Sequence, residues 1–348
     1  MKLLSIAAVF LLLFSLAMPV SAVEFTAPQV PESGAEQMPE HTDSFGSGLM
    51  ELLQNALLSL QPGVREGLRV SLSLVAAVMM VCLLRTCSGR VSNLAEFSGT
   101  VTIAGILLFS ANSMIALGSD TVREMSEYGK LLFPVLTAAS AAQGGVTGSA
   151  ALYAGTVALD AVISSLIAHL LVPMVYLFLA LGTANSALEE DVLKKMRDLV
   201  KTSMSWCLKT ILTVFTTYMS ITGVVSGTTD AAALKATKVT ISSVVPVVGG
   251  ILSDASEAVL VSAGLAKNAA GIYGILAILA IFLEPFSRIG IQYLILKATA
   301  AVCGIFGSKR MMGLIEDFST AMGLLLGMTG AVCLLLLIST VCFLKGVG

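Results

Sequence analysis

Long apolar stretches separated by short polar segments run through most of the chain. They cover about 70–84, 99–118, 131–187, 210–225, 269–283, 289–306 and 318–343. A helix that crosses a bilayer needs roughly 20 apolar residues, so the stretch at 131–187 has room for more than one crossing. The pattern predicts an all-α fold, a polytopic transmembrane helix bundle.

The first 22 residues form a pattern of their own. Lys2 precedes an apolar run over residues 3–17, and small residues follow at 20–22. A charged start, a short apolar core and small residues at a cleavage position predict a secretory signal peptide over 1–22. An uncleaved first membrane anchor is the alternative. In both cases the next segment begins outside the cytoplasm.

Residues 23–68 are predicted to form an extracytoplasmic tether followed by an amphipathic helix. Three prolines among Glu, Gly and Ser indicate a flexible segment over 24–46. Five leucines then share one helix face: Leu49, Leu52, Leu53, Leu57 and Leu60. This helix is expected to lie on the membrane surface or to dock on a partner. Two transmembrane helices are predicted over 69–130.

A proline spacing suggests an internal repeat in the remaining chain. The same interval of 39 residues separates two pairs, Pro134 and Pro173, then Pro246 and Pro285. Each pair is followed by a basic segment and a long apolar stretch. We interpret this as two diverged membrane units, 131–226 and 243–345.

Glycines interrupt both units shortly after the first proline. Irregular backbone at membrane depth is stable only where it is buried in protein or lines a water-filled cavity. Glycine-broken or re-entrant segments are therefore expected, and close helix packing is the alternative role for these glycines. The candidate conduit or broken-helix positions are Pro134, Gly144, Gly145, Pro246, Gly249 and Gly250.

Basic residues gather in two corresponding places. The first cluster is Lys194, Lys195, Arg197 and Lys201, and the second is Lys309 and Arg310. Short loops on the cytoplasmic side of a membrane are enriched in basic residues. If both clusters lie on that side, the two units are parallel. The segment 188–208 predicts an interfacial helix whose basic side meets anionic lipid or a protein partner. A solvated connector is the alternative.

Composition supports a membrane protein. The chain is 56% hydrophobic and 12% charged, and its mean hydropathy is +0.92. Soluble domains carry about 25% charged residues. A net charge of −2 gives no basic surface for nucleic acid. Six cysteines without a CxxC pair indicate small apolar fillers rather than a disulfide framework or a zinc site.

Few ionisable residues fall at membrane depth, where they are costly and mark functional candidates. The candidates are Asp160, Glu284 and Lys297, with His169 beside them. Structural roles are the alternative for each, such as an ion pair between Glu284 and Arg288 one turn later. No HExxH, GxSxG or P-loop motif occurs. No enzyme, metal site or cofactor is therefore predicted.

Two stretches in the second half resemble the stage III sporulation protein AE family. They are VSGTTDAAALKATKVTISSVVPVVGGILSDASEAVL, from Val225 to Leu260, and YGILAILAIFLEPFSRIGIQYLILKATAA, from Tyr273 to Ala301. The resemblance covers roughly residues 70–345. It implies a role in endospore formation, in the mother-cell membrane around the forespore. It also implies partners, namely other stage III sporulation A-operon membrane proteins and their cytoplasmic ATPase, within a channel complex across two membranes.

Two functions agree with these observations. The first is an integral membrane subunit of a secretion-like transenvelope complex, with protein partners and membrane lipid at its surfaces. The second is a self-contained secondary transporter or permease for a small solute, which repeats and broken helices would also suit. A transporter is expected to fail when one of Lys297, Asp160 or Glu284 is neutralised, whereas a scaffold is expected to tolerate such changes.

Overall fold

The computed structural model describes residues 28–39, 45–87, 92–142, 146–188, 190–221, 269–306 and 309–345. Nearly all of these residues are helical, and no strand occurs among them. The predicted all-α transmembrane bundle is confirmed. Several predictions lie outside the described residues: the signal peptide over 1–22, Gly144, Gly145, Pro246, Gly249 and Gly250.

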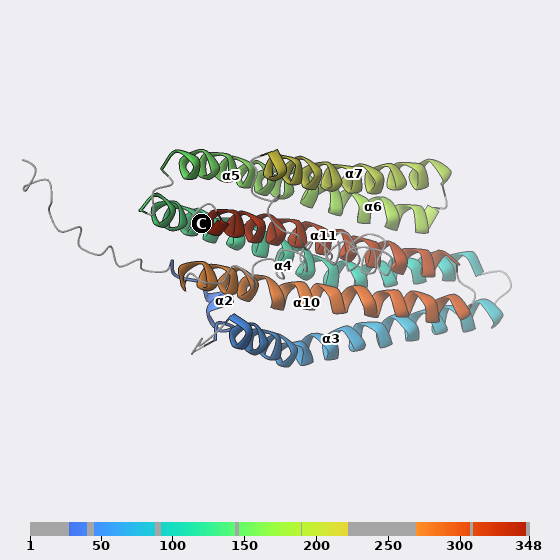
Figure 1. Ribbon diagram of the computed structural model, residues 1–348. Helices are drawn as coiled ribbons and strands as arrows, with labels where there is room; N and C mark the ends of the chain where they lie inside the picture. Colours follow the sequence, from blue (N-terminus) through green and yellow to red (C-terminus); the bar gives the residue numbers. More distant parts are fainter. Residues whose placement is uncertain are drawn as a thin grey trace, which may run out of the picture.

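The helices lie nearly side by side along one long axis (Figure 1). In chain order they are α2 (Glu32–Ala35), α3 (Phe45–Cys87), α4 (Ser92–Ala142), α5 (Val146–Leu166), α6 (Val172–Leu188), α7 (Asp191–Ile221), α10 (Ala269–Ile305) and α11 (Lys309–Lys345). A π-helical segment, Ile167–Leu171, joins α5 to α6. Together these three elements make one crossing of the bundle.

Five helical segments among the described residues are long and apolar enough to span a membrane. They are Phe45–Thr86, Leu94–Ala138, Tyr153–Leu188, Gly271–Ile305 and Lys309–Phe343. Five such segments make this a multi-pass membrane protein.

Helix α11 forms the centre of the bundle. Of the residues in its most apolar stretch, 94% are buried within the protein, against 22% for α3. It packs along α10 and α4, and on its other side along α6, α5 and α7. Helix α3 covers the outer side of α10 (Figure 1). The most apolar helix is therefore enclosed by protein, while α3 leaves most of its apolar surface for lipid.

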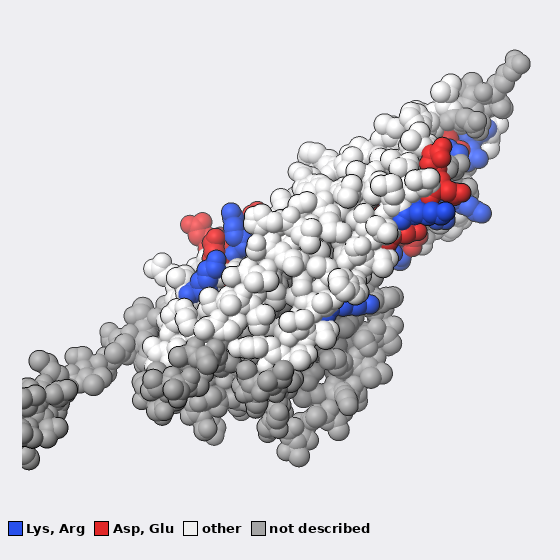
Figure 2. Space-filling view, turned by 90° about the horizontal axis from the view of Figure 1, so that it is seen from above, with Lys and Arg blue, Asp and Glu red and all other residues white. Residues whose placement is uncertain are grey.

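The longest helices exceed the thickness of a bilayer. Helix α4 has 51 residues, which is about 76 Å at roughly 1.5 Å per residue, whereas the hydrocarbon core is about 30 Å thick. Charged residues enter α4 again from Asp120 to Lys130. Figure 2 shows charged side chains mainly in two groups, with a broad uncharged surface between them. Parts of the bundle therefore extend beyond the hydrocarbon core.

Two pairs of predicted segments merge into single helices. The stretches 269–283 and 289–306 form one continuous α10 through Pro285. The predicted amphipathic helix is the first part of α3, which passes Pro62 without a break. A proline removes one backbone hydrogen bond and crowds the preceding turn. Neighbouring helices pack along both α3 and α10 and hold them straight enough to continue.

Proline 173 has a different local setting. It lies two residues after the π-helical segment Ile167–Leu171. A π-turn shifts the hydrogen-bond register by one residue, which accommodates the missing amide of a nearby proline. The pair Pro173 and Pro285, equivalent by spacing, thus lies in unlike backbone. The repeat itself stays a prediction, since Pro246 lies outside the described residues.

Both basic clusters lie at the same end of the bundle. Helix α7 begins at Asp191 and α11 at Lys309, and these two ends lie together at the right of Figure 1. We call this end the basic end and define it by Lys194, Lys195, Lys201, Lys309 and Arg310. The shared end agrees with a common cytoplasmic side for the two clusters.

Candidate functional site

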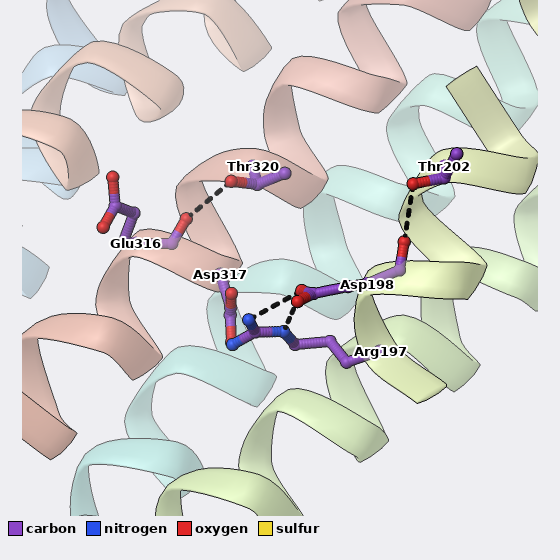
Figure 3. Close-up of polar contacts among 6 residues, drawn as sticks. All are labelled: Arg197, Asp198, Thr202, Glu316, Asp317 and Thr320. Atoms are coloured by element: carbon purple, nitrogen blue, oxygen red, sulfur yellow. Dashed lines mark hydrogen bonds and ion pairs between the residues drawn. The ribbon is translucent and has the colours of Figure 1, made fainter. Parts of the chain in front are cut away.

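The best-enclosed ion pair in the described part of the chain joins α7 to α11. The Arg197 guanidinium donates a hydrogen bond from Nη1 to Oδ2 of Asp317 over 2.9 Å. The two side chains are only 16% and 11% exposed. Asp198 accepts two further bonds from Arg197, 3.0 Å from Nε and 2.7 Å from Nη2. The guanidinium thus lies between two carboxylates (Figure 3).

A glycine of a third helix makes room for this ion pair. A Cβ atom on Gly182 of α6 would lie 2.8 Å from Oδ2 of Asp317 and 3.3 Å from its Cβ. Real Cβ atoms do not approach a carboxylate oxygen this closely without a shift of one of the groups. The absence of a side chain at Gly182 therefore allows α6, α7 and α11 to meet around Asp317.

The guanidinium stays charged in this environment. Burial lowers the pKa of Arg197, but hydrogen bonds and charge from Asp198 and Asp317 outweigh burial and hold the pKa above its ordinary value. A permanently charged group bound by two carboxylates fixes the orientation of both partners. The cluster of Arg197, Asp198 and Asp317 thus acts as a polar clasp between α7 and the central helix.

Lys297 belongs to a more exposed ion pair. Its Nζ atom lies 2.8 Å from Oε1 of Glu316 on α11, and the two side chains are about half exposed, at 51% and 48%. The backbone carbonyl of Glu316 also accepts a bond from Thr320 (Figure 3). The structure places Lys297 in a surface contact between α10 and α11.

Asp160 is the most deeply buried of the predicted intramembrane residues. It lies on α5 and is 2% exposed. Ser126 of α4 donates a hydrogen bond of 2.9 Å to its Oδ2, while its Oδ1 has no hydrogen-bond partner in the part of the chain that the structure describes. No cation among the described residues forms an ion pair with it. His169 lies on the exposed side of the π-helical segment and bonds the backbone carbonyl of Ser165.

Glu284 of α10 accepts a hydrogen bond from the segment 28–39, which was predicted to be part of a flexible tether. Gln37 donates from Nε2 to Oε2 of Glu284 over 3.2 Å, and Arg288 lies 3.8 Å from Oε1 one turn later. Ser33 donates a hydrogen bond to Glu124 of α4. Gly34 packs directly over Ile281. Residues 28–39 therefore dock on α10 and α4, which differs from the expectation of a flexible tether.

Helix α7 has two apolar faces. Its inner face packs against the bundle through Val200, Met204, Leu208 and Phe215, all buried. The α7 stripe is the exposed apolar face formed by Val192, Met196, Leu199, Trp206 and Val214. Lys194, Lys195 and Lys201 are exposed beside it. Helical spacing in the sequence places Val192, Met196, Leu199 and Trp206 on one face, and the structure adds Val214 to it. The structure also adds a second face that binds α7 to the bundle.

The predicted site residues lie in separate places in the structure. Lys297, Asp160 and Glu284 each bind a different partner and do not form one site. Arg197, grouped with the lysines by sequence, turns inward instead. Pro134 lies inside α4. The contact residues that the sequence did not indicate are Gln37, Ser126, Gly182, Asp198, Glu316 and Asp317. Arg197 and Asp317 are 120 positions apart, so no local pattern links them.

The described residues contain no group of three or more His, Cys, Asp or Glu side chains that could hold a metal ion. The polar groups described above join helices to one another.

Comparison with known proteins gives the family. The family model for stage III sporulation protein AE matches residues 42–346. Stage III sporulation protein AE of Bacillus subtilis (strain 168) is 22% identical over 231 residues, which are 66% of this chain and 58% of that relative. The match thus spans less than two thirds of the relative's length. No solved structure matches the chain. With the family model covering most of its length, the chain belongs to the stage III sporulation protein AE family.

Proposed function

We propose that this chain is an integral membrane subunit of a secretion-like channel complex that links mother cell and forespore during endospore formation. In this proposal it resides in the mother-cell membrane. Family membership supports a role in sporulation. The observation that carries the role of a subunit is the construction of α7, which is fixed to the bundle on one face and exposes a charged and apolar surface on the other.

The fixed face makes α7 a rigid part of the body. The clasp of Arg197 and Asp317 and the buried side chains Met204 and Leu208 hold it along α6 and α11. A recognition surface is most effective when it is held in place before the partner binds, because less freedom is lost on binding. Helix α7 meets this condition.

The exposed face offers chemistry for a partner at the basic end. Lys194, Lys195 and Lys201 lie within two turns of each other and are all exposed. Lys309 of α11 is exposed at the same end. Positive charge in this position favours an acidic protein surface, and the basic end is the expected cytoplasmic side. We propose that the basic end binds the cytoplasmic ATPase or another protein encoded by the same operon.

A self-contained transporter remains the second candidate because of one observation. Asp160 is a buried carboxylate at membrane depth without an ion-pair partner, and transporters use such groups to couple ions to solutes. Under that function, Asp160→Asn alone would abolish sporulation. Under the subunit function, Asp160→Asn would leave sporulation largely intact, and changes at the basic end would abolish it.

The test is a charge reversal at the basic end in the native spore-forming host. The variant carries Lys194→Glu, Lys195→Glu and Lys201→Glu. Expected results are a loss of heat-resistant spores by at least about tenfold, as from a lost interaction of about 1.4 kcal/mol, and loss of co-purification with the ATPase. Membrane levels of the chain are expected to stay unchanged, because all three side chains are exposed.

The matched control reverses two exposed arginines on another helix, Arg65→Glu and Arg69→Glu of α3. It is expected to retain both spores and ATPase. Normal sporulation and normal ATPase recovery in the lysine variant would refute docking at this end.

A further inference from the structure

The carboxyl group of Asp160 is isolated among apolar surroundings. It is the one charged residue within α5, and its side chain faces α4, where Ser126 donates its single hydrogen bond. The second oxygen, Oδ1, is buried and has no hydrogen-bond partner among the described residues. A buried carboxylate normally has two or more donors or a cation paired with it. Within the described part of the chain, Asp160 has one donor and no ion-pair partner.

The charged groups around Asp160 do not compensate for it. On α4, the charge of Lys130 favours an ionised Asp160, but Lys130 is exposed and makes no ion pair with Asp160. Glu127 is also exposed, and Glu124 is bound by Ser33. Helix α11 has no charged residue between Phe318 and Phe343.

The remaining neighbours of α5 are neutral or turned away. Helix α7 places the neutral Tyr218 against Gly155 of α5. His169 lies beyond the end of α5 and is exposed. Burial in this position disfavours an ionised carboxylate.

Two hydroxyl groups continue the polar line on the same face of α5. Thr156 and Ser164 lie four residues before and after Asp160, so all three side chains share one face. Their hydroxyl oxygens are buried and, like Oδ1 of Asp160, have no hydrogen-bond partner among the residues that the structure describes. Four residues of α-helix rise by about 6 Å. One water molecule can bridge two oxygens across such a gap and satisfy both.

We propose that Asp160 is a proton-binding site, at which Oδ1 takes up a proton from water and holds it in the folded protein. The new O–H bond removes the negative charge, and the proton is donated in a hydrogen bond to a bridging water or a neighbouring hydroxyl. Thr156 and Ser164 supply the oxygen positions along which the proton reaches and leaves the carboxyl group. This inference goes beyond the proposed function and does not depend on which complex the chain joins.

Infrared spectroscopy of the full-length chain in lipid nanodiscs tests the proposal. A protonated carboxyl group has a carbonyl stretch that a carboxylate lacks, and ¹³C-labelled aspartate shifts this band apart from those of glutamate. The expected result is an aspartate band near neutral pH that disappears in Asp160→Asn. Absence of the band in the wild-type chain, or its persistence in Asp160→Asn, would overturn the proposal. A wild-type chain without the band refutes the proposal without any variant, and Asp160→Asn serves only to assign a band that is present.

Thermal unfolding gives a second, independent reading. Asparagine is a neutral isostere of protonated aspartic acid, so Asp160→Asn is expected to change Tm by less than about 3 °C. Asp317→Asn serves as the comparison, because it weakens an ionised pair with Arg197 and is expected to lower Tm by more. Equal losses in the two variants would contradict a protonated Asp160.

Discussion

At the scale of single residues, Arg197 and Asp317 form the ion pair in which a change of one residue is expected to cost most stability. Both side chains are largely enclosed. Removing Arg197 leaves Asp317 as an uncompensated charge, whereas removing Asp317 leaves Arg197 paired with Asp198 alone. Lys297 and Glu316 form a pair of similar length in which both side chains are half exposed. The exposed fraction of the two side chains, rather than the distance between their charged atoms, therefore decides how much an ion pair contributes to stability.

A double-mutant cycle tests this difference. Arg197→Met alone is expected to reduce the free energy of unfolding by about 3–5 kcal/mol, because it leaves Asp317 as a buried unpaired charge. Asp317→Leu alone is expected to cost less, because Arg197 keeps its ion pair with Asp198. The double variant is expected to recover most of the loss. Thermal unfolding in detergent measures it. The matched pair Lys297→Met and Glu316→Gln is expected to cost less than about 1 kcal/mol each, and equal losses in both pairs would contradict the assignment.

Gly182 makes a separate prediction. Gly182→Ala is expected to lower Tm, since the added methyl group would press on Oδ2 of Asp317. Gly105→Ala in α4 is the control, because a Cβ atom at that position meets nothing within 4 Å. The control is expected to be neutral or stabilising by about 0.5–1 kcal/mol through the gain in helix propensity. A neutral Gly182→Ala would show that the three helices do not meet as closely as described.

At the scale of the element, α7 combines properties that usually belong to different helices. Its inner face packs like a core helix, its stripe is apolar and exposed, and its third side is basic. It is not among the five apolar spans, yet it lies along α6, which belongs to one of them. The stripe therefore has lipid as its expected environment, with the lysines directed toward the headgroups or a partner.

Trp206 reports directly on that environment. It is the chain's one tryptophan and is 69% exposed within the stripe. In nanodiscs with brominated acyl chains its fluorescence is expected to be strongly quenched, while acrylamide in water is expected to quench it weakly. The control moves the indole to the inner face with Trp206→Phe and Phe215→Trp, where lipid quenching is expected to fall. Strong acrylamide quenching of the wild-type chain would place α7 off the membrane.

At the scale of the whole molecule, the helix ends sort into two sides. The ends at Thr86, Glu190 and Lys309 lie at one end of the bundle, and the start of α3 lies at the other (Figure 1). Basic residues are concentrated on the first side, which we expect to be cytoplasmic. A central α11 surrounded by protein then makes this arrangement one unit rather than two independent halves.

Cysteine accessibility in intact cells tests the arrangement. In a cysteine-free background, Thr86→Cys, Glu190→Cys and Lys309→Cys are expected to be shielded from an impermeant thiol reagent. Gly46→Cys is expected to be labelled, because α3 begins at the opposite end and position 46 is exposed. Permeabilised cells provide the control for intrinsic reactivity. Labelling of positions 190 and 309 from opposite sides would contradict the structure.

The sequence by itself determined the class of the protein, because lipid selects for long apolar helices and this selection is visible in composition and run length. Helical periodicity also placed Val192, Met196, Leu199 and Trp206 on one face of a helix, and these four residues belong to the α7 stripe. The sequence identified Asp160 as a polar residue at membrane depth. Each of these properties depends on neighbours within a few turns of the chain.

Only the tertiary structure decided which apolar helix is enclosed and which faces lipid. Helices α3 and α11 are both apolar, and burial of one rather than the other depends on what packs around it. The same holds for Arg197, which is grouped with its neighbouring lysines by sequence but turns inward in the structure. It does so because Asp317, far away in the sequence, lies opposite it, and because Gly182 leaves the space. Contacts between residues far apart in the chain carry no local signal, so the packed bundle alone reveals them.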